Sequence, residues 1–99
     1  MQPVDLAHLS AQTGGDRALE ADVLRMFAAR SLADLARLKA VAPAARRDIA
    51  HLIVGSARAI GAGEVARLAA AIEAGEGDAH LLEVAIEQAR SFIAEYLGS

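Results

Sequence analysis

The fold of this chain is decided by residues 50–62, which read AHLIVGSARAIGA. Apolar side chains here recur three or four residues apart, a spacing typical of a helix with one buried face. At about 100° per residue, five residues fall within about 60° of one direction, which we take as the core: Ile49, Leu52, Ile53, Ser56 and Ile60. His51 lies roughly 160° from that direction, so we expect its imidazole to face solvent.

The outward face of this predicted helix carries charge and a glycine. Arg47, one turn before His51, and Arg58, two turns after it, share the outward face. Gly55 stands in mid-helix, where glycine costs about 1 kcal/mol relative to alanine. The glycine is explained either by close approach of another molecule or by close packing of a neighbouring helix. Because Gly55 lies far from the core direction, we favour the first explanation.

Composition predicts one small helical domain covering residues 1–99. Hydrophobic residues make up 55% of the chain, 25 residues are alanine, two are proline and none is cysteine. Alanine and leucine dominate over β-branched residues, so we predict an all-helical fold. The lack of cysteine excludes a disulfide framework, thiol chemistry and cysteine-ligated zinc.

Charge and hydropathy exclude further classes. The net charge of −3 argues against nucleic acid as a partner, because phosphate contacts need an excess of lysine and arginine. Asp5 and His8 interrupt any signal peptide, and no run of about 18 apolar residues could span a membrane. No helix face carries a trustworthy metal-ligand spacing. We expect a cytoplasmic protein without a metal, and Met1 and the short tail favour a stand-alone chain.

Capping residues and glycines divide the chain into five predicted helices. Asp5, Asp16 and Asp78 are suited to N-cap positions, and Pro43 to a first helical turn. The predicted helices cover residues 5–13, 16–41, 43–60, 63–74 and 78–97. Amphipathic segments joined by short connections predict an antiparallel up-down-up-down four-helix bundle with a short N-terminal cap helix.

Residues 50–62 resemble the signature of the histidine-containing phosphotransfer (HPt) domain family, approximately A-H-x-L-K-G-S-x-x-x-x-G-A. The positions that match by spacing are His51, Gly55, Ser56 and Gly61. Most of the remaining chain resembles the family at further positions: Gly14, Gly15, Asp16, Leu24, Phe27, Leu38, Leu68 and Glu73. The family's fold is an antiparallel four-helix bundle. The chain departs from the signature at Val54, where the family usually has a lysine that meets phosphoryl oxygens.

The resemblance implies a phosphocarrier rather than an enzyme. In such a protein, His51 accepts a phosphoryl group from an aspartate of a response-regulator receiver domain and passes it to another. The receiver, alone or within a hybrid histidine kinase, supplies a magnesium ion, so we assign no cofactor to this chain. Arg47 and Arg58 are candidates to supply the charge that Val54 lacks. The residues expected to contact the partner are Leu24, Leu32, Val54 and Gly55. We expect a monomer.

Two alternatives belong to other functional classes. The first is a degenerate bundle of the same fold that binds a receiver or a kinase without carrying phosphate, and Val54 is the residue that favours it. The second is an unrelated helical interaction module, whose alanine-rich faces would be the contacts. A conventional enzyme is disfavoured, because no pair of nucleophile and base is present.

Overall fold

The computed structural model describes residues 2–98, and every regular element within them is a helix. The elements are α1 (Leu6–Thr13), α2 (Arg17–Ala40), the 3₁₀ helix η1 (Pro43–Ala45), α3 (Arg46–Ile60), α4 (Gly63–Glu73) and α5 (Ala79–Tyr96). The all-helical prediction and the five predicted segments are confirmed. The third segment differs at its start, where Pro43 opens a 3₁₀ turn before the α-helix begins.

The predicted N-caps are also confirmed. Asp5, Asp16 and Asp78 precede α1, α2 and α5, and each carboxylate accepts a hydrogen bond from a backbone amide of the first turn, at 3.1, 3.0 and 2.8 Å. Each such cap is worth about 1 kcal/mol, because it satisfies an amide that the helix start leaves unpaired. At the other ends, Gly14 and Gly61 close α1 and α3 in the left-handed conformation that favours glycine.

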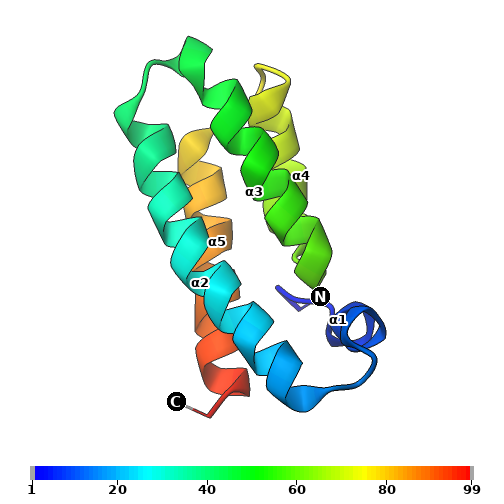
Figure 1. The fold of residues 1–99 in the computed structure, drawn as a ribbon. Coiled ribbons are helices and arrows are strands. Elements are labelled where there is room, and N and C mark those ends of the chain that lie inside the picture. Colours follow the sequence, from blue (N-terminus) through cyan, green and yellow to red (C-terminus); the bar gives the residue numbers. More distant parts are fainter. Residues whose placement is uncertain (1, 99) are drawn as a thin grey trace.

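The four longer helices enclose the core (Figure 1). α2 contacts α3 and α5, and α4 contacts the same two helices, so each of the four has two neighbours. α1 packs at one end, against α2 and α3. All five α-helices contribute large side chains with almost no exposed surface: Leu9, Leu24, Leu38, Ile53, Ile60, Val65, Leu82 and Ile86. The molecule measures 39 × 23 × 21 Å.

The N-terminal segment is fastened to the last turn of α3. The amide of Asp5 donates to the carbonyl of Gly61 at 2.9 Å, and Nε2 of His8 lies 2.9 Å from the carbonyl oxygen of Arg58. A side chain at Gly61 would place its Cβ 2.9 Å from Cβ of Asp5. The start of the chain therefore satisfies the carbonyl of Gly61 and adds a second contact to that of Arg58.

Replacement of Gly77 by alanine is expected to destabilise the fold. A Cβ at this position would lie 2.5 Å from the backbone nitrogen of Ile72 and 2.9 Å from its Cα, so the end of α4 would have to move. We expect Gly77→Ala to lower the free energy of unfolding by about 1–3 kcal/mol, measured by denaturant titration with circular dichroism. Gly63→Ala is the control, since a Cβ there meets nothing within 4 Å. Equal stability of the two variants would contradict the prediction.

Candidate functional site

The rotation of α3 differs from the prediction. Leu52, predicted to face the core, is 47% exposed, and Ser56 is only half-buried. The buried face consists instead of Ile49, Ala50, Ile53, Val54, Ala57 and Ile60. On a helical wheel this face is rotated by about 60° from the predicted one. The reason is that the prediction followed the largest apolar side chains, whereas Ala50 and Ala57 let a neighbouring helix approach α3 closely.

His51 lies on the surface of α3 and is held by a carboxylate of α4. Its side chain is 71% exposed, and its Nδ1 lies 2.7 Å from Oε2 of Glu73, whose side chain is 29% exposed. α4 folds back along α3 after the turn at Gly61, so the first part of α3 lies level with the end of α4. This register brings together two residues that are 22 positions apart in sequence.

The contact with Glu73 decides which imidazole nitrogen is available. An ionised carboxylate can only accept hydrogen bonds, so Nδ1 of His51 carries the proton that it donates to Glu73. In a neutral ring, the lone pair then resides on Nε2, on the far side of the ring from Glu73. The arrangement fixes one tautomer and presents one nucleophilic nitrogen to solvent. Sequence analysis matched Glu73 to a family pattern but did not predict this contact. The signal was present, since His51 and Glu73 are equally distant from Ala62 in the turn.

Gly55 forms an open notch one turn after His51. It lies on the exposed side of α3, and a Cβ built on it would meet nothing within 4 Å. The notch is therefore not filled by a neighbouring helix of the same chain. Of the two explanations for this glycine, close packing within the protein is excluded, and close approach of another molecule remains.

Three residues expected to contact a partner beside His51 do not lie there. Val54 and Leu24 are 4% and 0% exposed, because both point into the core. Leu32 is exposed, but it lies on the flank of α2 that faces α5. Ala28, one turn before Leu32, lines a groove against α5. Lys39, two turns after Leu32, pairs with Glu83 of α5 at 2.9 Å. Of the predicted contacts, Gly55 alone lies on the exposed surface of α3.

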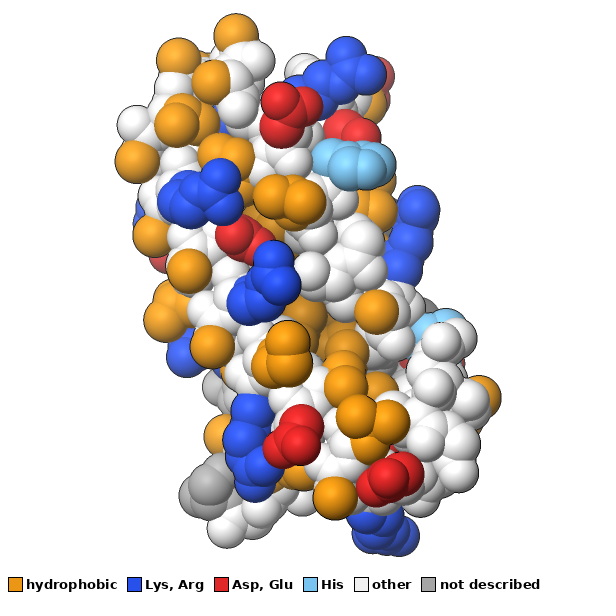
Figure 2. Space-filling view, viewed as in Figure 1, with side chains coloured by type: hydrophobic (Ala, Val, Ile, Leu, Met, Phe, Trp, Pro, Cys, Tyr) orange, Lys and Arg blue, Asp and Glu red, His pale blue; other side chains and the backbone are white. Residues whose placement is uncertain are grey.

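The surface beside Gly55 is a shallow hollow between α2 and α3. The hollow measures about 180 Å³ and is lined by Val23, Met26, Phe27, Arg30, Ser56, Ala59 and Ile60. Met26 is 58% exposed, and Leu52 adds further exposed apolar surface on α3. Figure 2 shows hydrophobic side chains exposed among charged ones on this face. Ser56 donates its hydroxyl to the carbonyl of Leu52 at 3.1 Å, the backbone contact expected for a serine within a helix.

Arg47 and Arg58 lie on the same stripe of α3 as His51, at positions −4 and +7 from it. Both side chains are exposed. Within residues 2–98 neither guanidinium takes part in an ion pair with another side chain. Both are therefore available to an anion that approaches this face.

Comparisons with known proteins identify no relative: no family model, curated protein or solved structure matches the chain. Among the described residues, no group of three or more His, Asp or Glu side chains could hold a metal ion. None of the helices in the same range is both long and apolar enough to cross a membrane.

We expect Gly55→Ala to leave the protein as stable as before or more stable, by up to about 1 kcal/mol, since alanine favours helix and the site is open. Thermal unfolding followed by circular dichroism measures the change. A loss of more than about 1 kcal/mol would show that a neighbouring helix does occupy the notch in solution.

The second prediction concerns which ring nitrogen of His51 carries the proton. We expect nitrogen NMR of the neutral ring to show a protonated Nδ1 and an unprotonated Nε2, because Glu73 accepts from Nδ1. Glu73→Ala should shift the population toward the Nε2-protonated tautomer that an isolated histidine prefers. Glu76→Ala, on the exposed loop after α4, is the matched control and should change nothing. An unchanged tautomer in Glu73→Ala would refute the assigned role of Glu73.

Proposed function

We propose that the protein is a histidine phosphotransfer protein of a cytoplasmic two-component phosphorelay, with His51 as the phosphoryl acceptor and donor. The observation that carries the proposal is an exposed imidazole whose Nδ1 is bound to Glu73 while Nε2 faces solvent. The resemblance of residues 50–62 to the HPt signature supports the same reading. The protein acts as a phosphocarrier, and its receiver partner completes the chemistry.

The proposed architecture is the antiparallel four-helix bundle of that family, with α1 as a cap. The pairing of α2, α3, α4 and α5, in which each helix contacts two others, supports it. The short connections between successive helices support alternating directions. In this architecture His51 projects from the outside of the bundle, where another protein can reach it.

The proposed reaction is attack of Nε2 on an aspartyl phosphate. The lone pair of Nε2 forms a bond to phosphorus, the bond between phosphorus and the aspartate oxygen breaks, and the carboxylate leaves with that electron pair. No proton has to move, because the ring keeps its proton on Nδ1. The ring becomes positive as the new bond forms, and the carboxylate of Glu73 stabilises this charge from the opposite side of the imidazole. The magnesium ion that neutralises the transferring group belongs to the receiver.

In the proposed reaction, Gly55 gives the receiver domain room to approach, and two arginines stabilise the phosphohistidine that forms. Gly55 removes a side chain at the point where a receiver loop would approach α3. Arg47 and Arg58 supply positive charge on the same stripe, in place of the lysine that the family usually has at the position of Val54. The solvent-exposed guanidinium groups can turn toward the phosphoryl oxygens after transfer.

The second candidate function is a bundle that binds a receiver or kinase without carrying phosphate. Val54 favours this alternative, because its buried, uncharged side chain cannot contact a phosphoryl group. The two functions make different predictions for labelling but the same prediction for binding.

Label transfer tests the proposal. The protein is incubated with phosphorylated receiver domains and magnesium, and acid-labile, alkali-stable label is expected on wild-type protein and absent from His51→Gln. Circular dichroism of His51→Gln should show an unchanged helical signal. Binding of receivers without label transfer would establish the second candidate function instead.

We expect Glu73→Ala to lower the rate of transfer by about 10- to 100-fold, the usual cost of removing a group that orients a functional histidine. The stability of the variant should change little, because the pair is exposed. Glu76→Ala serves as the control with an unchanged rate. Transfer at the wild-type rate in Glu73→Ala would show that the carboxylate of Glu73 does not assist phosphoryl transfer.

Arg47→Ala and Arg58→Ala are each expected to slow transfer by about 10-fold, which corresponds to about 1.4 kcal/mol of lost stabilisation. Arg67→Ala, on α4 and paired with Glu64, removes an equal charge elsewhere and should not slow it. Equal slowing of transfer in all three variants would show that only the net charge of the protein matters. Transfer at the wild-type rate in Arg47→Ala and Arg58→Ala would contradict the role assigned to these arginines.

A further inference from the structure

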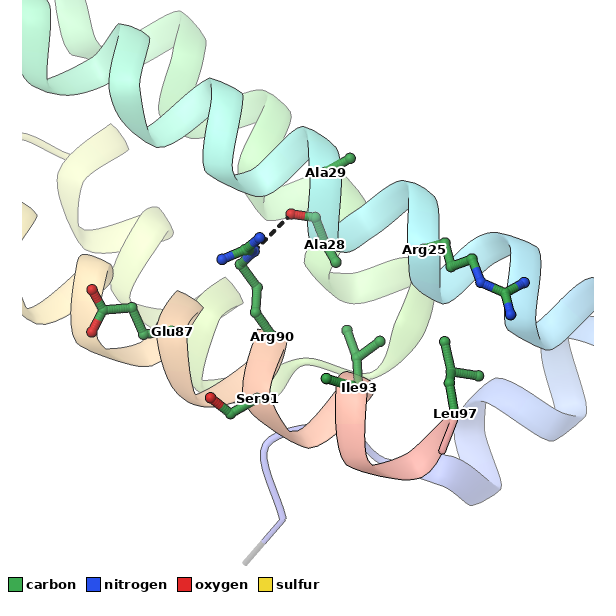
Figure 3. A pocket seen from close by; sticks show the side chains of 9 residues that line it. Arg25, Ala28, Ala29, Glu87, Arg90, Ser91, Ile93 and Leu97 are labelled. Atoms are coloured by element: carbon green, nitrogen blue, oxygen red, sulfur yellow. Dashed lines mark hydrogen bonds between the residues drawn. The ribbon is translucent and has the colours of Figure 1, made fainter. Parts of the chain in front are cut away.

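A groove between α2 and α5 lies apart from the surface around His51. Its volume is about 680 Å³. Its walls include Ala28 and Ala29 from α2, with Ile93 and Leu97 from the last part of the chain. Figure 3 shows Ile93 between Arg90 and Arg25, with Leu97 opposite Arg25 and Glu87 beyond Arg90. The groove thus has apolar walls, with Arg25 and Arg90 on either side of Ile93 and the carboxylate of Glu87 beyond Arg90.

Arg90 is fixed in place by the opposite helix. Its Nε donates to the carbonyl oxygen of Ala28 at 3.0 Å, and the residue is half-buried. The hydrogen bond uses one of the five N–H donors of a guanidinium. The terminal amino groups of Arg90 therefore remain free to donate to a carboxylate. Because the side chain is already held in place, binding a carboxylate costs it less conformational entropy.

The charge of α2 is opposite to that of the remaining chain. α2 contains five of the ten Lys and Arg residues but three of the thirteen Asp and Glu residues, so its formal charge is +2, against −5 for all other residues. Two of its three acids, Glu20 and Asp34, are buried. The exposed acid, Asp22, lies 3.7 Å from Arg25 in a surface pair of little energetic worth. Basic side chains are spaced along α2 in Figure 2. Glu87 is the acidic residue of the groove itself.

The outer face of α2 carries exposed apolar residues among its charged ones. Its solvent-facing side includes a series of exposed apolar residues: Ala29, Leu32, Ala33, Ala36 and Ala40. Leu32 is 48% exposed and continues the apolar line of Ala28 by one turn. Small side chains allow a further helix to approach closely, and an apolar face of this kind is typical of a contact surface.

We propose that the α2–α5 groove docks an acidic amphipathic helix of a partner protein. Arg90, held by the carbonyl of Ala28, offers its remaining N–H donors to a carboxylate of that helix, and Arg25 offers a second cation from α2. The apolar side chains of the docking helix would cover Ile93, Leu97 and Leu32.

Two other occupants fit the groove less well. A second copy would bring the basic surface of α2 against itself, where like charges repel. Nucleic acid would meet the −5 charge of the remaining chain. The groove is separate from His51, which lies on the flank of α3 that faces α4, so the proposal does not depend on phosphotransfer.

The test uses a synthetic helical peptide of about 18 residues, or five turns, built from alanine and leucine with glutamates one turn apart. Amide and methyl NMR of the full chain is recorded during titration. Shifts are expected at Ala28, Ala29, Ile93, Leu97 and Nε of Arg90, with weaker binding as salt increases. The same peptide with lysine in place of glutamate should produce no shifts at matched concentration.

Substitutions distinguish docking from a purely structural role of the arginines. Arg25→Glu and Arg90→Met should each weaken binding at least about 10-fold, and Arg90→Lys, which keeps the charge, should weaken it less. Arg67→Met and His51→Gln should bind normally, the latter separating this proposal from phosphotransfer. The proposal fails if the lysine peptide binds equally, if Arg25→Glu binds as wild type, or if shifts centre on the α2–α3 hollow. It also fails if an RNA oligonucleotide produces the same shifts, or if the protein alone dimerises through this face.

Discussion

The close contact between α3 and α4 determines where His51, Gly55 and Glu73 lie relative to one another. Ala50, Val54 and Ala57 lie on the flank of the buried face of α3 that is nearer His51, and α4 contributes buried alanines of its own. Because these side chains are small, the two helices approach closely, and the rotation of α3 about its axis is fixed. That rotation turns Gly55 outward and brings His51 level with Glu73. Larger side chains at the same positions would turn the imidazole away from its carboxylate.

The sequence alone predicted the features that depend on residues close in the chain, such as helix caps. It did not predict the features that depend on how each helix is rotated about its own axis. Asp5, Asp16 and Asp78 cap helices where they were predicted to, because an N-cap is a contact within one turn. Leu52 was assigned to the wrong face because periodicity weights large apolar residues and not the alanines that set interhelical distance. Glu73 was missed as a partner because the contact joins two helices. Leu24 and Leu32 were misplaced because the side of α2 that faces α3 cannot be read from α2 alone.

The division of charge gives the molecule two unlike surfaces. α2 is basic and rich in exposed alanine, whereas the other segments together are acidic. Long-range attraction would orient an acidic partner toward α2 before any contact forms. The same helix borders both the hollow beside Gly55 and the groove that contains Arg90.

Valine at position 54 has a consequence for Glu73 as well as for the phosphoryl group. Position 54 lies one turn after His51, on the same flank of α3 that faces α4. A lysine there would extend along α4 and place an ammonium group within reach of Glu73, in competition with the imidazole. With Val54 the carboxylate is committed to Nδ1 of His51, as the 2.7 Å contact shows. In the proposed phosphotransfer, Val54 removes a cation that would meet the phosphoryl oxygens, while Glu73 holds His51 in one tautomer and Arg47 and Arg58 supply positive charge on the exposed side of the same helix.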